Sequence, residues 1–174
     1  TDDLPAPLLA VDLDAFDANA RELLARADGR PLRLATKSVR VPALIERALA
    51  AGFEGLMTYS LAEALWWSTR TDDVLMGYPT VDRAALARLA ADPVARRTVT
   101  LMVDDVAHLD LIAEATATAR SKSGDDMPPI RVCLDIDASL RVGPFHLGVR
   151  RSPLRTPEDA VTLARQATRR GIEV

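Results

Sequence analysis

Lys37 is the residue of this sequence whose type and position best suit covalent chemistry. It is one of two lysines in a chain with twenty arginines, and it directly follows the apolar run 32–36. This run is typical of a β-strand, and a helical pattern begins soon after it at Pro42. Lys37 is therefore expected in the loop at the carboxyl end of a strand, where parallel α/β proteins keep their reactive groups. There a partly desolvated lysine amine forms Schiff bases with carbonyl groups, whereas in full contact with water it is an ordinary surface lysine.

Three further side chains are candidates for the same site. Tyr59 and Tyr78 each come at the end of a short predicted strand, where a phenol can donate a hydrogen bond or exchange a proton. For these tyrosines the alternative is a half-buried ring whose hydroxyl lies at the surface. Arg33 alternates with apolar neighbours in the strand before Lys37, so its side chain points either toward the site or toward solvent.

No metal site and no reactive thiol is predicted. His146 lies in a loop beside Gly143 and Pro144, and no second ligand stands at a metal-binding spacing from it. A lone histidine in such a loop is more often structural than a ligand. Cys133, the single cysteine, lies inside the apolar run 130–136 and is expected to be a small buried hydrophobic residue.

The composition is that of an ordinary globular protein and excludes several functions. The 174 residues carry a net charge of −3, 48% are hydrophobic and 27% are charged, and the arginines are scattered among acidic residues. Without a basic face, and with 4% aromatic residues, binding to nucleic acid is not expected. No apolar stretch of roughly eighteen residues and no charged-then-apolar leader is present, so we expect a cytoplasmic protein without membrane contact.

Short apolar runs alternate with longer amphipathic segments, which predicts repeated βα units and a parallel sheet. Strands are predicted over Leu8–Asp12, Leu32–Thr36, Gly55–Thr58, Val74–Met76, Thr98–Val103 and Ile130–Asp135, and another begins at Ile172–Val174. Helices are predicted over Asp14–Ala27, Pro42–Ala51, Ser60–Trp67, Asp82–Ala91, Asp104–Arg120 and Thr156–Arg170. The clearest helix start is the capping box Ser60-x-x-Glu63, and Gly171 marks the end of the last helix.

Two parallel-sheet architectures fit this alternation, a doubly wound open sheet and a barrel. A doubly wound sheet that binds nucleotides normally carries G-x-G-x-x-G or G-x-x-x-x-G-K-[ST] after an early strand, and neither motif is present. We therefore favour an α/β fold of the (β/α)8 TIM-barrel type. A closed barrel takes roughly 250 residues. The sequence ends just as a new strand begins at Ile172, so we expect an incomplete N-terminal portion of a longer polypeptide.

Four segments, in this order, resemble the pyridoxal-phosphate barrel enzymes of the alanine racemase N-terminal type (fold type III), in the branch of D-threonine aldolases and D-serine dehydratases. Segment 5–19 is similar to the opening T-P-x-x-x-V-D-L-D-x-x-x-x-N, and segment 33–37 stands where the branch has R-P-H-x-K. Leu34 and Ala35 replace the proline and histidine of that motif. Segment 72–79 resembles D-D-I-L-x-x-Y-P, and segment 137–143 resembles D-x-G-x-x-R-x-G with one residue fewer before the arginine.

The resemblance implies an arrangement of domains. Residues 1–13 would be a first strand that joins a C-terminal β-domain, and residues 14–174 the N-terminal part of the pyridoxal-phosphate-binding barrel. The rest of the barrel and the C-terminal domain would lie beyond Val174. They would contain the phosphate-binding loops and, in metal-dependent members, the ligands of a divalent metal. The full-length protein would be a homodimer.

The resemblance also implies a function. Lys37 would hold pyridoxal phosphate as a Schiff base, Arg141 would contact the phenolic oxygen of the cofactor, and Tyr59, Tyr78 and Arg33 would complete the cofactor-binding set. The expected enzyme is a lyase or racemase, which means an aldolase, a dehydratase/deaminase or a racemase for small D-amino acids or β-hydroxy amino acids. The alternatives are a non-catalytic pyridoxal-phosphate-binding protein of cofactor homeostasis, and a barrel with a structural role only.

Overall fold

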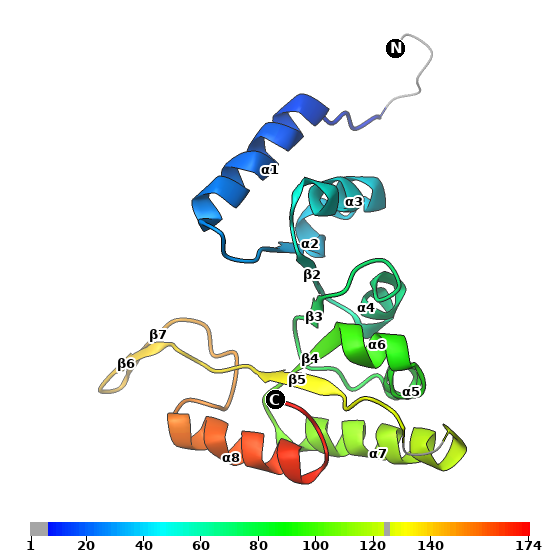
Figure 1. The fold of residues 1–174 in the computed structure, drawn as a ribbon. Coiled ribbons are helices and arrows are strands. Elements are labelled where there is room, and N and C mark those ends of the chain that lie inside the picture. The colour runs from blue at the N-terminus through cyan, green and yellow to red at the C-terminus, as the bar shows by residue number, and fades with distance from the viewer. Residues whose placement is uncertain (1–6, 124–125) are drawn as a thin grey trace.

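The computed structural model describes residues 7–123 and 126–174, and its centre is a sheet of five parallel strands (Figure 1). The strands are β1 (Arg33–Ala35), β2 (Gly55–Thr58), β3 (Val74–Met76), β4 (Val99–Val103) and β5 (Arg131–Leu134). They lie side by side in the order of the sequence, and each neighbouring pair is parallel. Because a doubly wound sheet reverses this order at a switch point, the sequential order identifies the N-terminal portion of a (β/α)8 barrel.

Helices alternate with the strands, and most of them start where the sequence predicts. They are α1 (Leu13–Ala27), α2 (Thr36–Val39), α3 (Pro42–Ala51), α4 (Leu61–Trp67), α5 (Arg83–Ala91), α6 (Pro93–Thr98), α7 (Val106–Ser123) and α8 (Pro157–Arg169). The Ser60 hydroxyl accepts a hydrogen bond at the start of α4, as predicted, and the Thr156 hydroxyl does so at the start of α8. The short helices α2 and α6 are not predicted, because so few residues show no helical period. Within the described ranges, no helix has the length and apolar character needed to cross a membrane.

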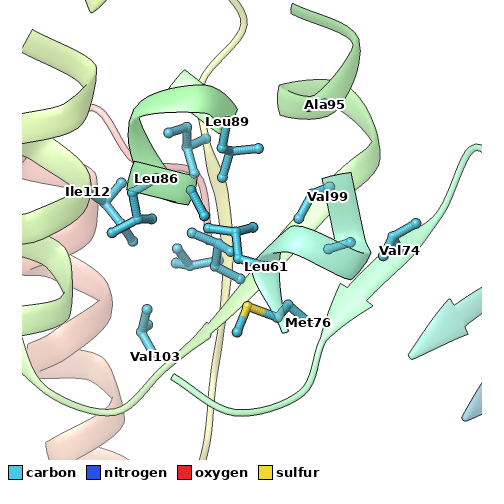
Figure 2. Close-up of a cluster of buried hydrophobic side chains, with 14 of the residues drawn as sticks. Leu61, Val74, Met76, Leu86, Leu89, Ala95, Val99, Val103 and Ile112 are labelled. Carbon is cyan, nitrogen blue, oxygen red and sulfur yellow. The ribbon is translucent and has the colours of Figure 1, made fainter. Parts of the chain in front are cut away.

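The hydrophobic core lies between the helices and one face of the sheet (Figure 2). Alternate strand residues point to this face, and Leu56, Val74 and Leu101 are each at most 1% exposed. Figure 2 shows the apolar side chains of α4, α5 and α7 that meet this face: Leu61, Leu86, Leu89 and Ile112. Strand residues on the opposite face, such as Met57 and Met102, are half-buried. The strands are therefore held by one helix-covered face.

Helix α1 packs outside this core, beside α3 (Figure 1). A small apolar cluster around Phe53 joins the two helices, and the Arg47 guanidinium donates two hydrogen bonds to the Asp17 carboxylate. The predicted strand Leu8–Asp12 is not formed, because no described strand pairs with it, and its apolar side chains are exposed. The pairing of this segment with a further domain stays a prediction.

A hairpin that the sequence does not predict follows β5. Its strands β6 (Leu140–Val142) and β7 (Phe145–Leu147) form a separate antiparallel sheet that projects from the body of the protein (Figure 1). The turn contains Gly143 with φ 56, a conformation that glycine adopts without strain. After α8 the chain returns to the sheet, where Glu173 forms a parallel bridge with Arg131 of β5. This bridge confirms the strand start predicted at Ile172–Val174.

Candidate active site

Lys37 and the two candidate tyrosines meet at the carboxyl edge of the sheet. Lys37 lies just past β1, in the one-turn helix α2 that replaces the predicted loop. Tyr59 directly follows β2, and Tyr78 lies just past β3. Because these three strands are parallel neighbours, their carboxyl ends are adjacent and bring the three side chains together. This is the edge at which barrel proteins assemble their active sites.

Lys37 lines a pocket of about 350 Å³, a volume in the range of small-molecule sites. The other lining residues come from α2 and from the start of α4: Thr36, Arg40, Tyr59, Ser60 and Glu63. The buried Thr36 hydroxyl donates a hydrogen bond to the Met57 carbonyl at 3.3 Å, which ties α2 to β2. The Lys37 side chain is exposed, and its amine lies against the Tyr59 ring without a salt bridge to any described carboxylate. The amine is therefore accessible to a ligand.

Glu63 and Arg40 fix the backbone around this pocket. The Glu63 carboxylate accepts a hydrogen bond from the Tyr59 N–H at 3.2 Å, and the Glu63 N–H donates to the Ser60 hydroxyl at 3.2 Å. The Glu63 carboxylate thus binds the residue before the N-cap, and this contact holds the chain where it leaves β2. Arg40 donates from Nε to the Lys37 carbonyl at 3.1 Å. The sequence reveals the capping box but not that its residues line the pocket, and it gives no signal for Arg40.

Four side chains form a continuous row of contacts that we call the aromatic row: Lys37, Tyr59, Tyr78 and Arg151. The Lys37 Nζ lies 4.6 Å from the centroid of the Tyr59 ring, and the centroids of the Tyr59 and Tyr78 rings are 5.7 Å apart. The guanidinium carbon of Arg151 lies 5.5 Å from the centroid of the Tyr78 ring. Both cations are within the distance of about 6 Å at which a ring face attracts a positive charge. The row thus connects the pocket with the loop after β7.

The backbone of Tyr78 is strained. Its φ of 117° is rare for any residue other than glycine. Strain of this kind concentrates at functional sites, where the surrounding structure holds an unfavourable conformation. At Gly77, before it, an added Cβ would meet the side chain of Met57, so the turn after β3 is closely packed. This turn places the Tyr78 ring against Tyr59.

Arg33 does not line the pocket of Lys37, and its contact with a cofactor stays a prediction. It begins β1 at the amino edge of the sheet, the edge opposite Lys37, and donates two hydrogen bonds to the Asp73 carboxylate before β3. This hydrogen bonding raises the pKa of the Arg33 guanidinium, which stays charged. Gly55 makes room for the pair, because a Cβ there would collide with Asp73. Arg33 therefore serves the packing of the sheet.

Arg141 lies on the hairpin and does not line the pocket of Lys37. It is exposed in β6 and directly opposite His146 of β7, so both side chains project from the same face of the hairpin. The Nε2 atom of His146 is buried and has no hydrogen-bond partner in the part of the chain that the structure describes. A contact of Arg141 with a cofactor stays a prediction.

The chemistry that this site offers is that of an amine beside two phenols. Among residues 7–123 and 126–174, no group of histidine, cysteine and acidic side chains has the geometry to hold a metal ion. Burial raises the pKa of the half-buried Cys133 thiol, which keeps it protonated and unreactive. An accessible amine such as that of Lys37 is able to capture a carbonyl group.

The sequential parallel sheet, with an accessible lysine past its first strand, defines an α/β protein of the barrel class. The sequence profile of the family described as the alanine racemase N-terminal domain matches residues 11–173. The chain therefore belongs to this family. Among curated proteins, none matches the sequence significantly.

Two solved structures show the same fold. The D-threonine aldolase from Filomicrobium marinum is 26% identical with a TM-score of 0.73, and the match covers 95% of this chain and 41% of that one. The D-threo-3-hydroxyaspartate dehydratase from Delftia sp. HT23 is 24% identical with a TM-score of 0.71, and the match covers 99% and 42%. The chain thus spans about two fifths of the length of these enzymes. These similarities confirm the predicted branch of the family.

Enzymes of this family use pyridoxal phosphate, and the described pocket fits the reactive end of that cofactor. The aldehyde requires an accessible amine, which Lys37 supplies at the carboxyl edge of the sheet. The flat pyridine ring requires an apolar or aromatic wall, which Tyr59 supplies and Tyr78 extends. Lys37, Tyr59 and Tyr78 are therefore the described residues that would hold the cofactor.

Proposed function

We propose that this chain carries the cofactor-binding part of a pyridoxal-phosphate-dependent lyase or racemase for small D-amino acids or β-hydroxy amino acids. The observation that carries the proposal is the accessible Lys37 amine, 4.6 Å from the centroid of the Tyr59 ring at the carboxyl edge of a barrel sheet. Membership of the alanine racemase N-terminal domain family and the similarity to a D-threonine aldolase support it. We extend the proposal to a homodimeric enzyme of the cytoplasm.

The residues of the pocket have distinct tasks in this proposal. When bound, pyridoxal phosphate supplies an electron sink that weakens the bonds at the Cα of an amino acid. Lys37 holds the cofactor through its amine and, once released, removes or returns the Cα proton. The Tyr59 ring fixes the position of the Lys37 Nζ. The Tyr78 ring extends the aromatic wall beside Tyr59.

The test is to trap the cofactor on Lys37 with borohydride, in the full-length protein that contains this chain. The protein is incubated with pyridoxal phosphate, reduced, digested and mapped by mass spectrometry. We expect the adduct on Lys37 and its loss in Lys37→Ala. Lys122→Ala is the matched control, because Lys122 is the other lysine of the sequence. An adduct on Lys122 alone, or none in the wild type, would refute the proposal.

A second measurement separates the enzyme from a non-catalytic cofactor-binding protein. The loaded protein is incubated in deuterium oxide with D-threonine, D-serine and D-alanine, and exchange of the Cα proton is followed by NMR. We expect exchange in the wild type and none in Lys37→Ala. Capture of the cofactor without exchange of any Cα proton would instead favour a role in cofactor homeostasis.

A further inference from the structure

The geometry points to Arg151 as the residue that binds an oxyanion of the ligands of this site, either the carboxylate of the amino-acid substrate or the phosphate of the cofactor. This inference rests on the proposed function, since both oxyanions belong to ligands captured at Lys37. Its basis is the aromatic row, which places the Arg151 guanidinium 5.5 Å from the Tyr78 ring centroid. Tyr78 in turn contacts Tyr59, whose ring lies beneath the Lys37 amine.

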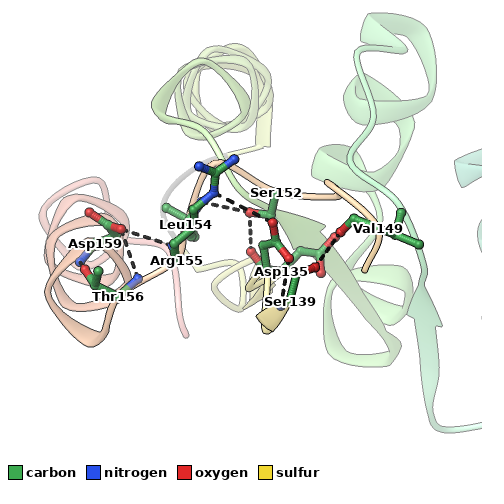
Figure 3. A network of polar contacts seen from close by, with 9 residues as sticks. Asp135, Ser139, Val149, Ser152, Leu154, Arg155, Thr156 and Asp159 are labelled. Carbon is green, nitrogen blue, oxygen red and sulfur yellow. Dashed lines mark hydrogen bonds and ion pairs between the residues drawn. The ribbon is translucent and has the colours of Figure 1, made fainter. Parts of the chain in front are cut away.

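The loop that carries Arg151 is anchored on both sides of the arginine (Figure 3). Before it, the Val149 carbonyl accepts a hydrogen bond from the Ser139 hydroxyl at 2.9 Å. After it, the buried Ser152 hydroxyl donates to the Asp135 carbonyl at the end of β5, at 2.6 Å, and accepts from the Leu154 N–H. The backbone around Arg151 is therefore held to the carboxyl end of the sheet, so that less ordering is needed when a ligand binds.

A third anchor lies further along the same loop. The Leu154 carbonyl accepts a hydrogen bond from the Asp137 N–H at 2.8 Å, and the Arg155 guanidinium lies 3.7 Å from the Asp137 carboxylate. Arg155 thus has a carboxylate partner within the network of Figure 3. Arg151, four residues earlier, forms no salt bridge with any described carboxylate, and its side chain is exposed. The Asp137 carboxylate therefore neutralises the charge of Arg155, whereas the charge of Arg151 stays available to a ligand.

The chemistry of the guanidinium then indicates the ligand. A guanidinium that lies over a ring keeps its N–H groups free in one plane, and this fork matches the paired oxygens of a carboxylate or phosphate. The substrates proposed for this site carry a carboxylate, and the cofactor carries a phosphate. The Tyr78 ring holds the cation without neutralising it, so the charge remains available.

The experiment compares ligands that differ only in the oxyanion. In the full-length protein, half-saturating concentrations are measured for pyridoxal phosphate against pyridoxal, and for D-threonine against 1-aminopropan-2-ol, which lacks the carboxylate. Arg151→Gln and Arg151→Lys are the variants, and Arg150→Gln is the matched control on the neighbouring exposed arginine. Hydrogen bonds to a charged group contribute about 1.5–3 kcal/mol, which corresponds to roughly ten- to a hundredfold in affinity.

We expect Arg151→Gln to weaken one oxyanion ligand by at least about tenfold and to leave its oxyanion-free analogue unchanged. Loss for D-threonine alone assigns Arg151 to the substrate carboxylate, and loss for pyridoxal phosphate alone assigns it to the cofactor phosphate. Equal affinities in Arg151→Gln and Arg150→Gln for all four ligands would overturn the inference. So would an equal loss for a ligand and its analogue, because that pattern indicates a structural role.

A direct measurement decides the inference even if Lys37 captures no cofactor. The arginine Nε–H signals are followed by NMR during titration with inorganic phosphate and with acetate. We expect the Arg151 signal to shift with one of the anions and to be absent in Arg151→Gln. If Lys37 captures no pyridoxal phosphate in the trapping experiment and the Arg151 signal still shifts, the proposed function is refuted and the anion site stands. An Arg151 signal that does not respond to either anion would refute the anion site.

Discussion

The Nζ atom of Lys37 lies 4.6 Å from the centroid of the Tyr59 ring, although the two residues follow different strands. The register of β1 and β2 creates this contact, because it sets the carboxyl ends of the two strands side by side. A lysine at this position would otherwise sample many rotamers in water. The ring restricts the amine to the mouth of the barrel and so links the sheet to the proposed chemistry.

Replacing Tyr59 tests whether its ring positions the amine. A cation over an exposed ring contributes about 0.5–1 kcal/mol. We therefore expect Tyr59→Leu to raise the half-saturating concentration of pyridoxal phosphate by about two- to fivefold, and Tyr59→Phe to stay within about twofold of the wild type. The measurement is an absorbance titration of the full-length protein. If Tyr59→Phe were as impaired as Tyr59→Leu, the hydroxyl and not the ring would be the important group.

The sequence alone predicts the position of Lys37 and the type of sheet. The apolar run 32–36 marks a strand, and a residue that follows a strand in a βα unit must lie at the carboxyl edge. The same reasoning places Tyr59 and Tyr78 correctly. Local pattern is sufficient here, because the period of the apolar residues and the turn residues determine where each strand ends.

The sequence does not predict the placement of Arg33 or the contact of Arg151 with Tyr78. Alternation along a strand predicts the face of the sheet to which a side chain points, but it does not predict the partner of that side chain. Arg33 lies at the amino edge of the sheet, and its partner Asp73 is 40 residues away in the sequence. Arg151 has no local signature, because its contact with Tyr78 depends on the hairpin β6–β7 and on the hydrogen bonds of Ser152. Contacts between distant segments create both arrangements, and a single sequence shows no pattern for them.

Two glycines provide a matched test of packing in the sheet. At Gly55 an added Cβ would lie 2.8 Å from the Asp73 backbone carbonyl, which cannot move without breaking the β2–β3 pairing. At Gly77 the Cβ would meet the flexible end of the Met57 side chain. We expect Gly55→Ala to lower the free energy of unfolding by about 2 kcal/mol or more, and Gly77→Ala by about 1 kcal/mol or less. Chemical denaturation measures the free energy of unfolding of both variants. A larger loss in Gly77→Ala than in Gly55→Ala would show that β2 and β3 can separate.

The Asp159 carboxylate at the start of α8 predicts a dependence of stability on pH. It accepts hydrogen bonds from the N–H groups of Arg155 and Thr156, each at 3.0 Å, and these bonds lower its pKa from the usual 3.8. Because the folded protein binds this proton less readily than the unfolded chain, the carboxylate stabilises the fold fully above pH 3.8. The stabilisation is lost as the pH falls below that value through the pKa of the folded state.

The variant Asp159→Asn keeps the shape of the cap and removes its charge. We expect it to be less stable than the wild type at pH 7, and the difference to shrink as the pH falls below 3.8. Denaturation curves at pH 7 and pH 3 measure this difference. A difference that is the same at both pH values would show that the charge of Asp159 does not stabilise the helix.

The strain at Tyr78 can be separated from the contacts of its ring. A residue held at a rare positive φ costs on the order of 1–3 kcal/mol, and glycine adopts φ 117 without this cost. Tyr78→Ala loses the ring and keeps the strain, whereas Tyr78→Gly loses the ring and relieves it. We therefore expect Tyr78→Gly to be more stable than Tyr78→Ala by about 1 kcal/mol, as measured by chemical denaturation.

Both variants should bind the oxyanion ligand of Arg151 more weakly, because the ring that holds the guanidinium is gone. A Tyr78→Gly variant that is more stable than the wild type yet impaired in ligand binding would show that the strain serves the site and not the fold.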